Sequence, residues 1–584
     1  MSKFNNKNAV AVKEIKGFCG IDTRSPGDGE GKTKNMVNYR ILSDGSLVKR
    51  GGIKFVTSFD SEIRALWTGY ENNSFVGYAL TGRLVYKLFF DDNGEYISRT
   101  QLGYIDTSIG KASIFFYRGY YYIIDSDELY VIKSGGIVKA TGYAPLYGKD
   151  WPTGEVGEVN EPLNTLTRQA RISYIVTDPP NIFLCTKYPV ASVEAVYVNG
   201  ERLSSSEYEI DSELNTININ LMDPGDKILV YLTYASDSCS LERLKKNTNA
   251  TVFGGINNSR VFMWSDNSHY MFCSSYVSEE AYAESEAIYS GNGALYFPSM
   301  HEFCVGDGSK NIKGVSRHYD RLLIFTEGET WMADSSVNST ELTPILRINS
   351  SSGALSNLGI ARCENDPVSV DRGRILRWKS NTDELDDCNS YVISEEIKAL
   401  LNDDFYAQAV AFEDKFHSEV LFARRNDESG KVYVYEEKNG NWYTYDLVAL
   451  SGFYAGKNNV GFYAGGKLYT FDDSLSFDIY EDGAQKSVSA TLSTYPMDFG
   501  LPHNKKRLAV LNMLADTDGE DVKISFVSDN GVSSEHIFCG TDSEYVASYS
   551  KKLNTDRFVR TSMDIISEAD NKQRIYKLAI TAKH

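Results

Sequence analysis

The sequence predicts a mostly-β protein: a β-propeller with a small immunoglobulin-like β-sandwich inserted after its first blades and a second β-sandwich at the C-terminus. Three observations predict this fold class. A phrase of turn residues and short Tyr-rich apolar strands returns between residues 111 and 470. The chain holds 39 Tyr and 28 Phe, whose flat rings pack well on pleated surfaces. Patterns typical of long helices are few.

The repeated phrase has the size of a β-hairpin, about half of one propeller blade. One such unit cannot bury its own apolar faces, so copies must pack on one another, and a ring of blades closes that packing. We count about seven units, within a range of six to eight, because the first unit can share a blade with the last and so leave few free edges. The units cover 63–88, 112–131, 251–272, 312–332, 367–378, 410–445 and 453–471.

Five segments follow in chain order. Residues 1–55 form an N-terminal segment with a hairpin, whose tight turn is supplied by Ser43, Asp44 and Gly45. The first propeller blades are expected at 56–165, after which a polar linker interrupts the pattern.

The inserted sandwich is expected at 170–236, where short strands alternate apolar and polar positions. Asn199-Gly200 is a strong signal of a two-residue hairpin turn. The alternating apolar positions need a second sheet to cover them, which predicts a sandwich.

The remaining blades are expected at 237–486, after a helical turn around 241–246. A helix is predicted at 394–401, with Ile393, Ile397, Leu400 and Leu401 on one face, and we expect it to cover a blade edge. Longer alternating strands predict the C-terminal sandwich at 487–584, with a tight turn at 528–531.

Charge and cysteine usage narrow the function classes. The net charge of −19 and the lack of a Lys/Arg run disfavour a nucleic-acid grip, and an acidic surface suits a passage through which DNA slides, although solubility alone also explains it. No signal core or membrane span of about 18 apolar residues is found, so we expect folding in a cytoplasm. No CxxC pair occurs, and we expect buried thiols at Cys19, Cys185, Cys239, Cys273, Cys304, Cys363, Cys388 and Cys539.

The candidate phosphate-binding, calcium-binding and histidine motifs lack the residue spacing that their functions require. Residues 27–33 resemble a phosphate-binding loop, but Pro26 stands where the first Gly is required and no βα unit surrounds it. Residues 516–519 resemble the start of a calcium loop without its later ligands, so we expect an ordinary hairpin turn. The seven His (269, 301, 318, 417, 503, 536 and 584) show no metal or general-base spacing. We therefore predict no catalytic, cofactor-binding or metal site, no cofactor and no enzyme.

Several phrases in chain order carry a family resemblance. They are 35–52, 143–166, 296–298 with 322–331, 353–356, and 498–505. Together they resemble the bacteriophage tail nozzle and stabilisation (tail accessory) proteins, with Gly51 where that family usually has Pro. The resemblance implies a structural virion protein of the phage tail, a hexameric ring below the portal and adaptor through which the genome is retained and then ejected.

The partners that this resemblance implies are further copies of the chain, the portal and adaptor proteins, tail fibres or a spike, and double-stranded DNA that passes without specific binding. Synthesis in a bacterial cytoplasm and a place in the virion tail would follow. Two alternatives stay open: a carbohydrate-binding propeller, and a propeller glycosidase with carboxylates and Arg at the ring centre. For the first, aromatic rings would stack on sugars, and the recurring Trp67, Trp264, Trp331, Trp378 and Trp442 are candidates, although core packing also explains them.

Overall fold

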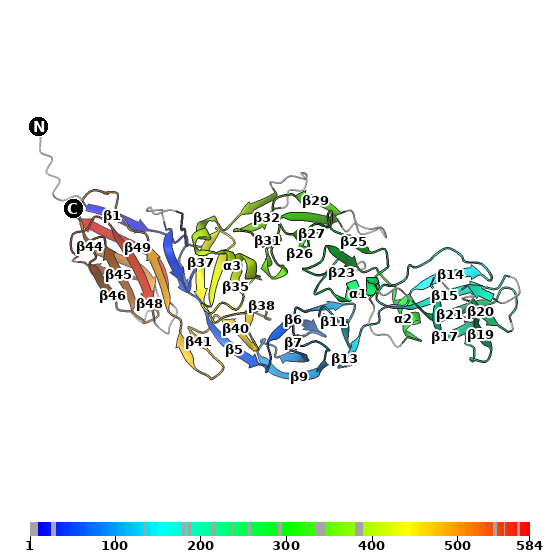
Figure 1. Ribbon diagram of the computed structural model, residues 1–584. Coiled ribbons are helices and arrows are strands. Elements are labelled where there is room, and N and C mark those ends of the chain that lie inside the picture. The colour runs from blue at the N-terminus through cyan, green and yellow to red at the C-terminus, as the bar shows by residue number, and fades with distance from the viewer. Residues whose placement is uncertain are drawn as a thin grey trace, which may run out of the picture.

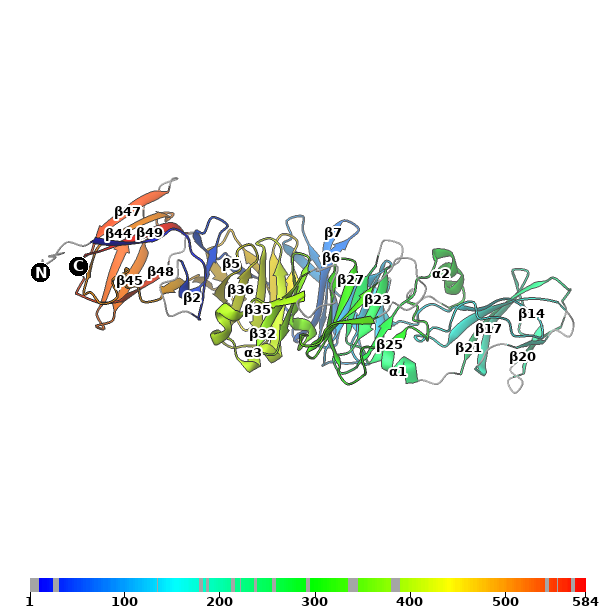
Figure 2. The same cartoon turned by 90° about the horizontal axis from the view of Figure 1, so that it is seen from above.

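The structure is a computed structural model in which an elongated molecule carries a propeller at its middle (Figures 1 and 2). One β-sandwich lies at the end that holds both termini, and the inserted sandwich lies at the opposite end. The structure describes residues 10–24, 31–133, 135–177, 182–184, 188–211, 216–220, 222–235, 239–254, 259–289, 295–334, 345–379, 389–540, 546–553, 555–568 and 573–583.

Among the described residues, seven four-stranded antiparallel blades form the propeller, and each is given from its first strand to its last. Blades 1 to 3 are β6 (Ile63–Glu71), β7 (Ser74–Thr81), β8 (Leu84–Phe90), β9 (Tyr96–Tyr104); β10 (Ser113–Tyr117), β11 (Tyr120–Ile124), β12 (Leu129–Lys133), β13 (Gly136–Lys139); and β22 (Asn249–Phe253), β23 (Arg260–Trp264), β24 (Tyr270–Cys273), β25 (Glu302–Cys304). Blades 4 and 5 are β26 (Ile312–His318), β27 (Arg321–Thr326), β28 (Glu329–Asp334), β29 (Ile345–Asn349); and β30 (Ile360–Cys363), β31 (Asp366–Asp371), β32 (Arg374–Trp378), β33 (Ser390–Val392). Blade 6 is β34 (Ala409–Asp414), β35 (Glu419–Arg424), β36 (Lys431–Glu436), β37 (Asn441–Asp446), and blade 7 is β38 (Gly452–Ala455), β39 (Val460–Ala464), β40 (Lys467–Asp472), β5 (Gly52–Ser58).

The first strand of each blade lies nearest the propeller axis, because first strands of neighbouring blades contact one another. The repeated phrase of the sequence corresponds to two strands of each blade that pack against neighbours on both faces. Strand β27, for example, is buried at five of its six positions. Outer strands such as β9 are largely exposed and polar, so they carry little apolar signal. Each unit therefore belongs to one full blade.

The ring closes through the N-terminal segment. Strand β5 pairs antiparallel with β40 and becomes the last strand of blade 7, while residues 63–88 form part of a separate first blade. The first and last units therefore do not share a blade. The predicted N-terminal segment instead supplies the strand that covers an otherwise free edge.

The insert is a sandwich of two sheets between blades 2 and 3. One sheet runs β14 (Leu146–Pro152), β15 (Gln169–Ile175), β21 (Lys227–Tyr234), β17 (Val190–Val198), β18 (Glu201–Arg202), and the other runs β16 (Ile182–Leu184), β20 (Thr216–Ile219), β19 (Tyr208–Asp211). Asn199-Gly200 makes the tight turn between β17 and β18, as predicted. Residues 146–152, which the sequence assigns to the propeller part, pair parallel with β15 and so belong to the insert.

Helical elements are few among the described residues. Helix α1 (Cys239–Lys245) lies where a helical turn is predicted. The predicted helix at 394–401 is a 3₁₀ helix, η3 (Glu395–Leu400), followed by α3 (Asp403–Gln408) with Asn402 as its N-cap. Another 3₁₀ turn, η1 (Asn357–Gly359), precedes β30, and α2 (Glu279–Glu286) was not predicted because its apolar periodicity is weak.

The C-terminal sandwich takes strands from both ends of the chain. One sheet orders β3 (Tyr39–Ile41), β4 (Leu47–Lys49), β49 (Arg574–Lys583), β44 (Arg507–Asp516), β47 (Ala547–Lys552), with β1 (Val10–Ile15) also on β49. The other orders β2 (Thr33–Val37), β43 (Ala490–Thr494), β48 (Thr561–Ser567), β45 (Val522–Ser528), β46 (Ser533–Phe538). The predicted turns at 43–45 and 528–531 join β3 to β4 and β45 to β46.

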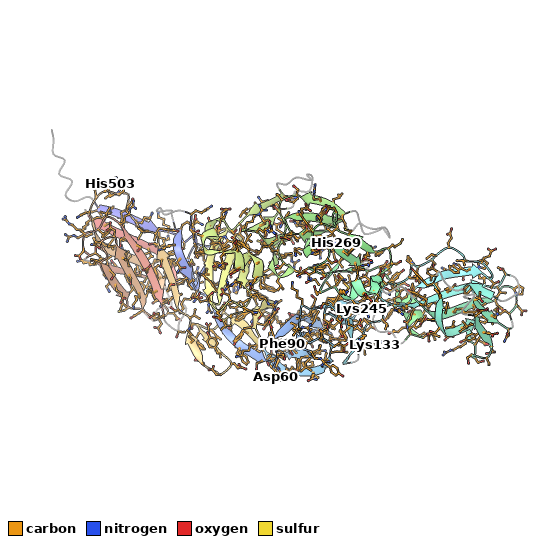
Figure 3. All side chains as sticks on the ribbon, viewed as in Figure 1. Asp60, Phe90, Lys133, Lys245, His269 and His503 are labelled. Carbon is orange, nitrogen blue, oxygen red and sulfur yellow. The ribbon has the colours of Figure 1, made fainter. Side chains whose placement is uncertain are left out.

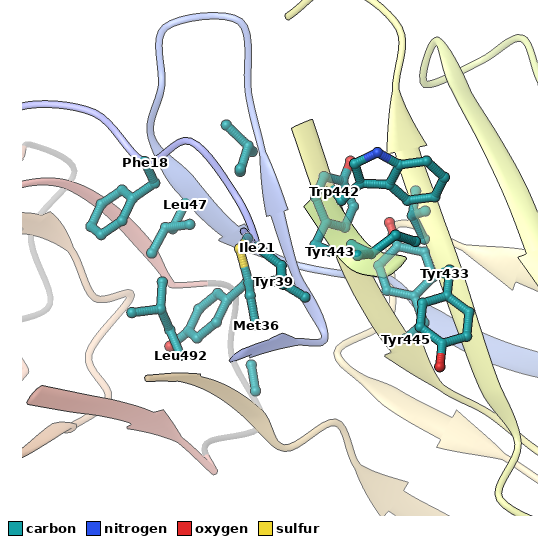
Figure 4. Close-up of a cluster of buried hydrophobic side chains, with 14 of the residues drawn as sticks. Phe18, Ile21, Met36, Tyr39, Leu47, Tyr433, Trp442, Tyr443, Tyr445 and Leu492 are labelled. Atoms are coloured by element: carbon teal, nitrogen blue, oxygen red, sulfur yellow. The ribbon is translucent and has the colours of Figure 1, made fainter. Parts of the chain in front are cut away.

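One N-terminal strand joins the two bodies. Strand β2 pairs antiparallel with β43 of the sandwich and parallel with β37 of blade 6, so one continuous nine-stranded sheet runs from the propeller into the sandwich. Blade 7 is extended in a similar way by β41 (Phe477–Ile479) and β42 (Gln485–Ser487), since β41 pairs with β5. Figure 4 shows the core at this joint, with side chains of the N-terminal segment between Leu492 and Trp442.

A glycine permits the closest approach at the joint. Gly20 has φ +72°, and a Cβ added to it would lie 2.4 Å from the carbonyl oxygen of Trp442. The backbone N–H of the next residue, Ile21, donates to that same carbonyl at 2.7 Å. Only a residue without a side chain fits this contact between the N-terminal segment and blade 6.

Candidate functional site

The two motifs that resemble a phosphate-binding loop and a calcium loop come first. Residues 25–30 of the glycine-rich loop lie outside the described residues, and its Lys32 forms an ion pair with Glu396 at 2.8 Å. Asp516 ends a strand, and the turn follows at 517–520, with Asp518 and Gly519 at positive φ. The turn joins β44 (Arg507–Asp516) to β45 (Val522–Ser528), which lie in two different sheets, so the expectation of a hairpin turn was wrong.

Two of the expected buried thiols are exposed. Cys273 and Cys363 are buried and Cys19 is half-buried, but Cys304 and Cys539 are exposed, so the prediction was wrong for these two. Both follow or end an outer strand of a sheet, where one side of the chain faces solvent. Cys185, Cys388 and the side chain of Cys239 lie outside the described part of the structure.

Three of the five recurring Trp side chains lie in the core, where they could not stack on a sugar. Trp264, Trp378 and Trp442 are at most 1% exposed and belong to the propeller core, while Trp67 and Trp331 are half-buried. Trp67 packs on Tyr121 with ring centroids 4.9 Å apart. Core packing therefore accounts for the three buried rings.

Histidines are scattered, as their spacing predicts: His503 lies on the terminal sandwich and His269 on the propeller (Figure 3). One of them, His417, lies in a cluster that spacing alone did not reveal. Ligand atoms of Asp414, His417 and Glu419 all lie within 4.8 Å of one another, which is the geometry of a candidate metal site.

The hydrogen bonds of this cluster fit an ion-pair network and not a metal site. His417 Nδ1 lies 2.6 Å from Asp414 and Nε2 lies 2.6 Å from Asp473, so both ring nitrogens act as donors in the charged imidazolium. Burial lowers the pKa of His417, but the hydrogen bonds to Asp414 and Asp473 outweigh it and raise the pKa to about 9. Neither nitrogen then has a lone pair for a metal ion.

Glu419 is held from three sides in the same network. It accepts hydrogen bonds from Arg40 Nε at 2.8 Å, Tyr443 at 2.7 Å and Tyr445 at 3.1 Å. Because Arg40 lies on β3 and Glu419 on blade 6, the network fastens the N-terminal segment to the propeller. Sequence reasoning missed it because its members come from three distant segments.

A cup of about 990 Å³ opens on the propeller axis. Its lining comes from six of the seven blades, at the face of the disc where the first strands begin. Tyr104 and Ile109 stand at the cup with 66% and 81% of their surface exposed. Basic residues dominate the charged lining, which consists of Arg64, Arg83, Lys111, Arg425 and the single carboxylate Glu62.

The four cations of the cup are held differently. Arg64 donates to the carbonyls of Gly82, Thr107 and Gly110, so it fixes the loops of the wall. Lys111 pairs with Asp266. Burial lowers the pKa of Arg64, which a nearby Asp125 carboxylate partly offsets.

The side chains of Arg83 and Arg425 make fewer interactions with the protein. Arg83 is exposed, donates Nε to the carbonyl of Ile105, and forms no ion pair with the described residues. Arg425 contacts Glu62 at 3.3 Å, and its buried Nε has no hydrogen-bond partner in the described structure. The cup thus offers two guanidinium groups that a ligand could engage.

Comparisons with known proteins show no relative in sequence. No family model and no curated protein matches the chain. The structure is similar to an exo-β-1,3-galactanase from Phanerochaete chrysosporium, with 9% identity, a TM-score of 0.22, and coverage of 96% of this chain and 99% of that one. It is also similar to the Pan2 WD40 domain of Neurospora crassa, with 7% identity, a TM-score of 0.32, and coverage of 74% and 97%.

A third similar structure is the AfRom2 CNH domain, with 7% identity, a TM-score of 0.33, and coverage of 72% of this chain and 99% of that one. Such low scores transfer no activity, and the propeller assignment rests on the sheet topology. Among the described helices, none has the length and apolar character that crossing a membrane requires.

Proposed function

We propose that this protein is a structural subunit of a bacteriophage tail: a nozzle, or tail-hub, protein that forms a hexameric ring, continues the portal and adaptor channel, retains the packaged DNA and conducts it during ejection. The proposal starts from the phrases that resemble the tail nozzle and stabilisation family. Those phrases fall at structurally distinct places, with 35–52 at the joint of sandwich and propeller and 498–505 inside the terminal sandwich.

The observation that carries the proposal is the path of the N-terminal segment. Its strands add to both sheets of the terminal sandwich, continue the sheet of blade 6 and close blade 7. A sandwich and a propeller joined through shared sheets resist bending more than two domains on a flexible linker. Such stiffness suits a conduit wall that must keep its shape while DNA passes.

The charged groups support a role without catalysis. The net charge of −19 disfavours binding of the chain to phosphate, which suits a channel that does not hold its DNA. The axial cup has one lining carboxylate, Glu62, whereas glycoside hydrolysis in most families uses two.

The insert gives the ring subunit a second arm. It lies at the end of the molecule opposite the terminal sandwich (Figure 2). We place this arm outside the channel, where it would contact neighbouring copies or attached fibres. A chain that lacks residues 172–234 should still assemble but lose these attachments, whereas complete misfolding of the propeller would count against this placement.

The proposal is tested in the virus by removing the gene product. We expect heads that package DNA and then lose it, with the distal part of the tail missing. Supplying the intact chain in trans should restore full particles. Infectious particles with complete tails in the absence of the protein would overturn the proposal.

A further inference from the structure

We propose that the axial cup is a binding site for an acidic saccharide, a hydroxyl-rich sugar that carries a carboxylate or a phosphate. This function is separate from the proposed ring role and requires only the single folded chain. The volume of the cup, about 990 Å³, lies at the upper end of the range of about 300–1,000 Å³ that is typical of small-ligand sites.

Charge is the first argument. Four cationic side chains and one carboxylate line the cup, in a chain whose net charge is −19. Two of the four cations already interact with protein groups: Arg64 supports the loops of the wall, and Lys111 forms an ion pair. The guanidinium groups of Arg83 and Arg425 are left as donors for an anion, and their planar forks match carboxylate and phosphate oxygens.

Arg425 supplies the second argument. A buried donor without a partner costs free energy, so it is normally satisfied by protein, water or ligand. The Nε of Arg425 is such a donor, and the side chain is held by one contact of 3.3 Å to Glu62. An anion in the cup would replace Glu62 as the partner and let the side chain shift toward the ligand.

The remaining lining favours a sugar over a bare anion. Exposed Ser61 and Ser108 can exchange hydrogen bonds with sugar hydroxyl groups. Tyr104 exposes 66% of its surface, and Arg83 Cζ lies over one face of its ring, 5.4 Å from the centroid, so a sugar would stack on the opposite face. Aromatic faces of this kind stack on the apolar side of sugar rings.

The experiment is isothermal titration of the purified full-length chain with three probes. Trigalacturonate carries carboxylates, glucose 6-phosphate carries a phosphate, and maltotriose is neutral. We expect one or both acidic probes to bind, with an affinity that falls as salt rises, and maltotriose not to bind. Binding of trigalacturonate would show that the site takes a carboxylate, and binding of glucose 6-phosphate would show that it takes a phosphate. Absence of binding by both acidic probes, or equal binding of maltotriose, would overturn the proposal.

Variants assign the binding to the cup. We expect Arg83→Ala and Arg425→Ala each to raise Kd about tenfold or more, since each removes a charge-assisted hydrogen bond. Glu62→Gln should lower Kd about threefold, because it removes the competing carboxylate. The matched control is Arg372→Ala, an exposed arginine in the β31–β32 turn that does not line the cup.

Thermal unfolding of each variant confirms that the propeller is intact, so that a lost signal reports the site. Equal affinity of Arg83→Ala, Arg425→Ala and Arg372→Ala would overturn the assignment to the cup. A Glu62→Gln variant that binds more weakly than the wild-type chain would also contradict it, because the proposal requires this change to strengthen binding.

Discussion

Arg50 and Asp478 form a two-pronged ion pair, in which Nη1 and Nη2 of the arginine each lie 2.9 Å from a different carboxylate oxygen. Their side chains are 2% and 7% exposed. Arg50 stands between β4 and β5, and Asp478 lies on β41, just before the terminal sandwich. The pair thus fixes the N-terminal segment where the propeller meets the sandwich.

Replacing Arg50 by Met should destabilise this joint by about 3–5 kcal/mol, because Asp478 would remain buried without its counter-ion. Chemical denaturation followed by tryptophan fluorescence measures the loss, since Trp442 lies at the joint. Combining Arg50→Met with Asp478→Leu should recover part of it, as no charge is then left unpaired.

The control is Lys16→Ala, which breaks an exposed pair with Glu14 and should change stability by less than about 1 kcal/mol. If Arg50→Met cost no more than this control, the joint would not depend on the buried pair.

His417 predicts a loss of stability at alkaline pH. Because its pKa is raised to about 9 in the folded chain, above the usual 6.5, its contribution is complete below pH 6.5 and disappears as the pH rises through 9. We expect stability to fall by up to about 3 kcal/mol between pH 6.5 and 9.5. His417→Gln should remove this part of the slope.

The difference in slope between the wild-type chain and His417→Gln reports the contribution of His417 alone. Burial raises the pKa of Cys273 to about 11 and also raises that of Cys363, which adds a slope of the same sign in both chains. Burial lowers the pKa of the neighbouring Arg40, but the Glu419 carboxylate and other nearby groups outweigh it and raise that pKa well above its usual value, so Arg40 stays charged over this range. His503→Gln, on the exposed surface of the sandwich, should keep the wild-type slope; a His417→Gln chain that kept it too would refute the network.

Closure of the ring predicts the effect of a proline on β5. Lys54 lies between Thr470 of β40 and Ile479 of β41, so Lys54→Pro should break pairing on one side and cost about 3 kcal/mol or more. Amide hydrogen exchange should rise in β38–β40 and not in blade 3. Lys54→Ala is the control, because it removes only the pair with Glu95 near the surface.

Arg171 predicts how the insert is attached. It is 1% exposed and donates to the carbonyl of Ala144, the hydroxyl of Tyr143 and the carboxylate of Glu284 on α2. Arg171→Met should cost about 2–4 kcal/mol and raise hydrogen exchange in α2 and β15. The exposed neighbour Arg168→Met should change neither, and equal effects of the two changes would contradict the attachment.

The sequence could predict the blades, because two strands of each blade carry a dense apolar pattern between tight turns. The predicted hairpins at 43–45, 199–200 and 528–531 formed for the same reason, since their turn residues act locally. The sharing of strands between distant segments could not be predicted. Pairing of β2 with β37 and β43 depends on contacts between residues some 400 positions apart, which no local pattern records.

The axial cup could not be predicted from the sequence for a related reason. Arg64 on β6 and Arg83 in the β7–β8 turn belong to blade 1, whereas Arg425 follows β35 of blade 6 more than 300 residues later, and only closure of the ring brings it to the same cup. Their spacing in the chain has no periodicity. A charge count of the whole chain points the other way, because acidic residues elsewhere outnumber them.

The central claim is that the chain is a ring subunit, and electron microscopy of the purified protein tests it most directly, alone and mixed with its portal and adaptor. The account predicts a closed six-fold ring with a central hole in at least one of the two samples, with the propellers arranged around the hole. Isolated elongated particles in both samples would contradict it.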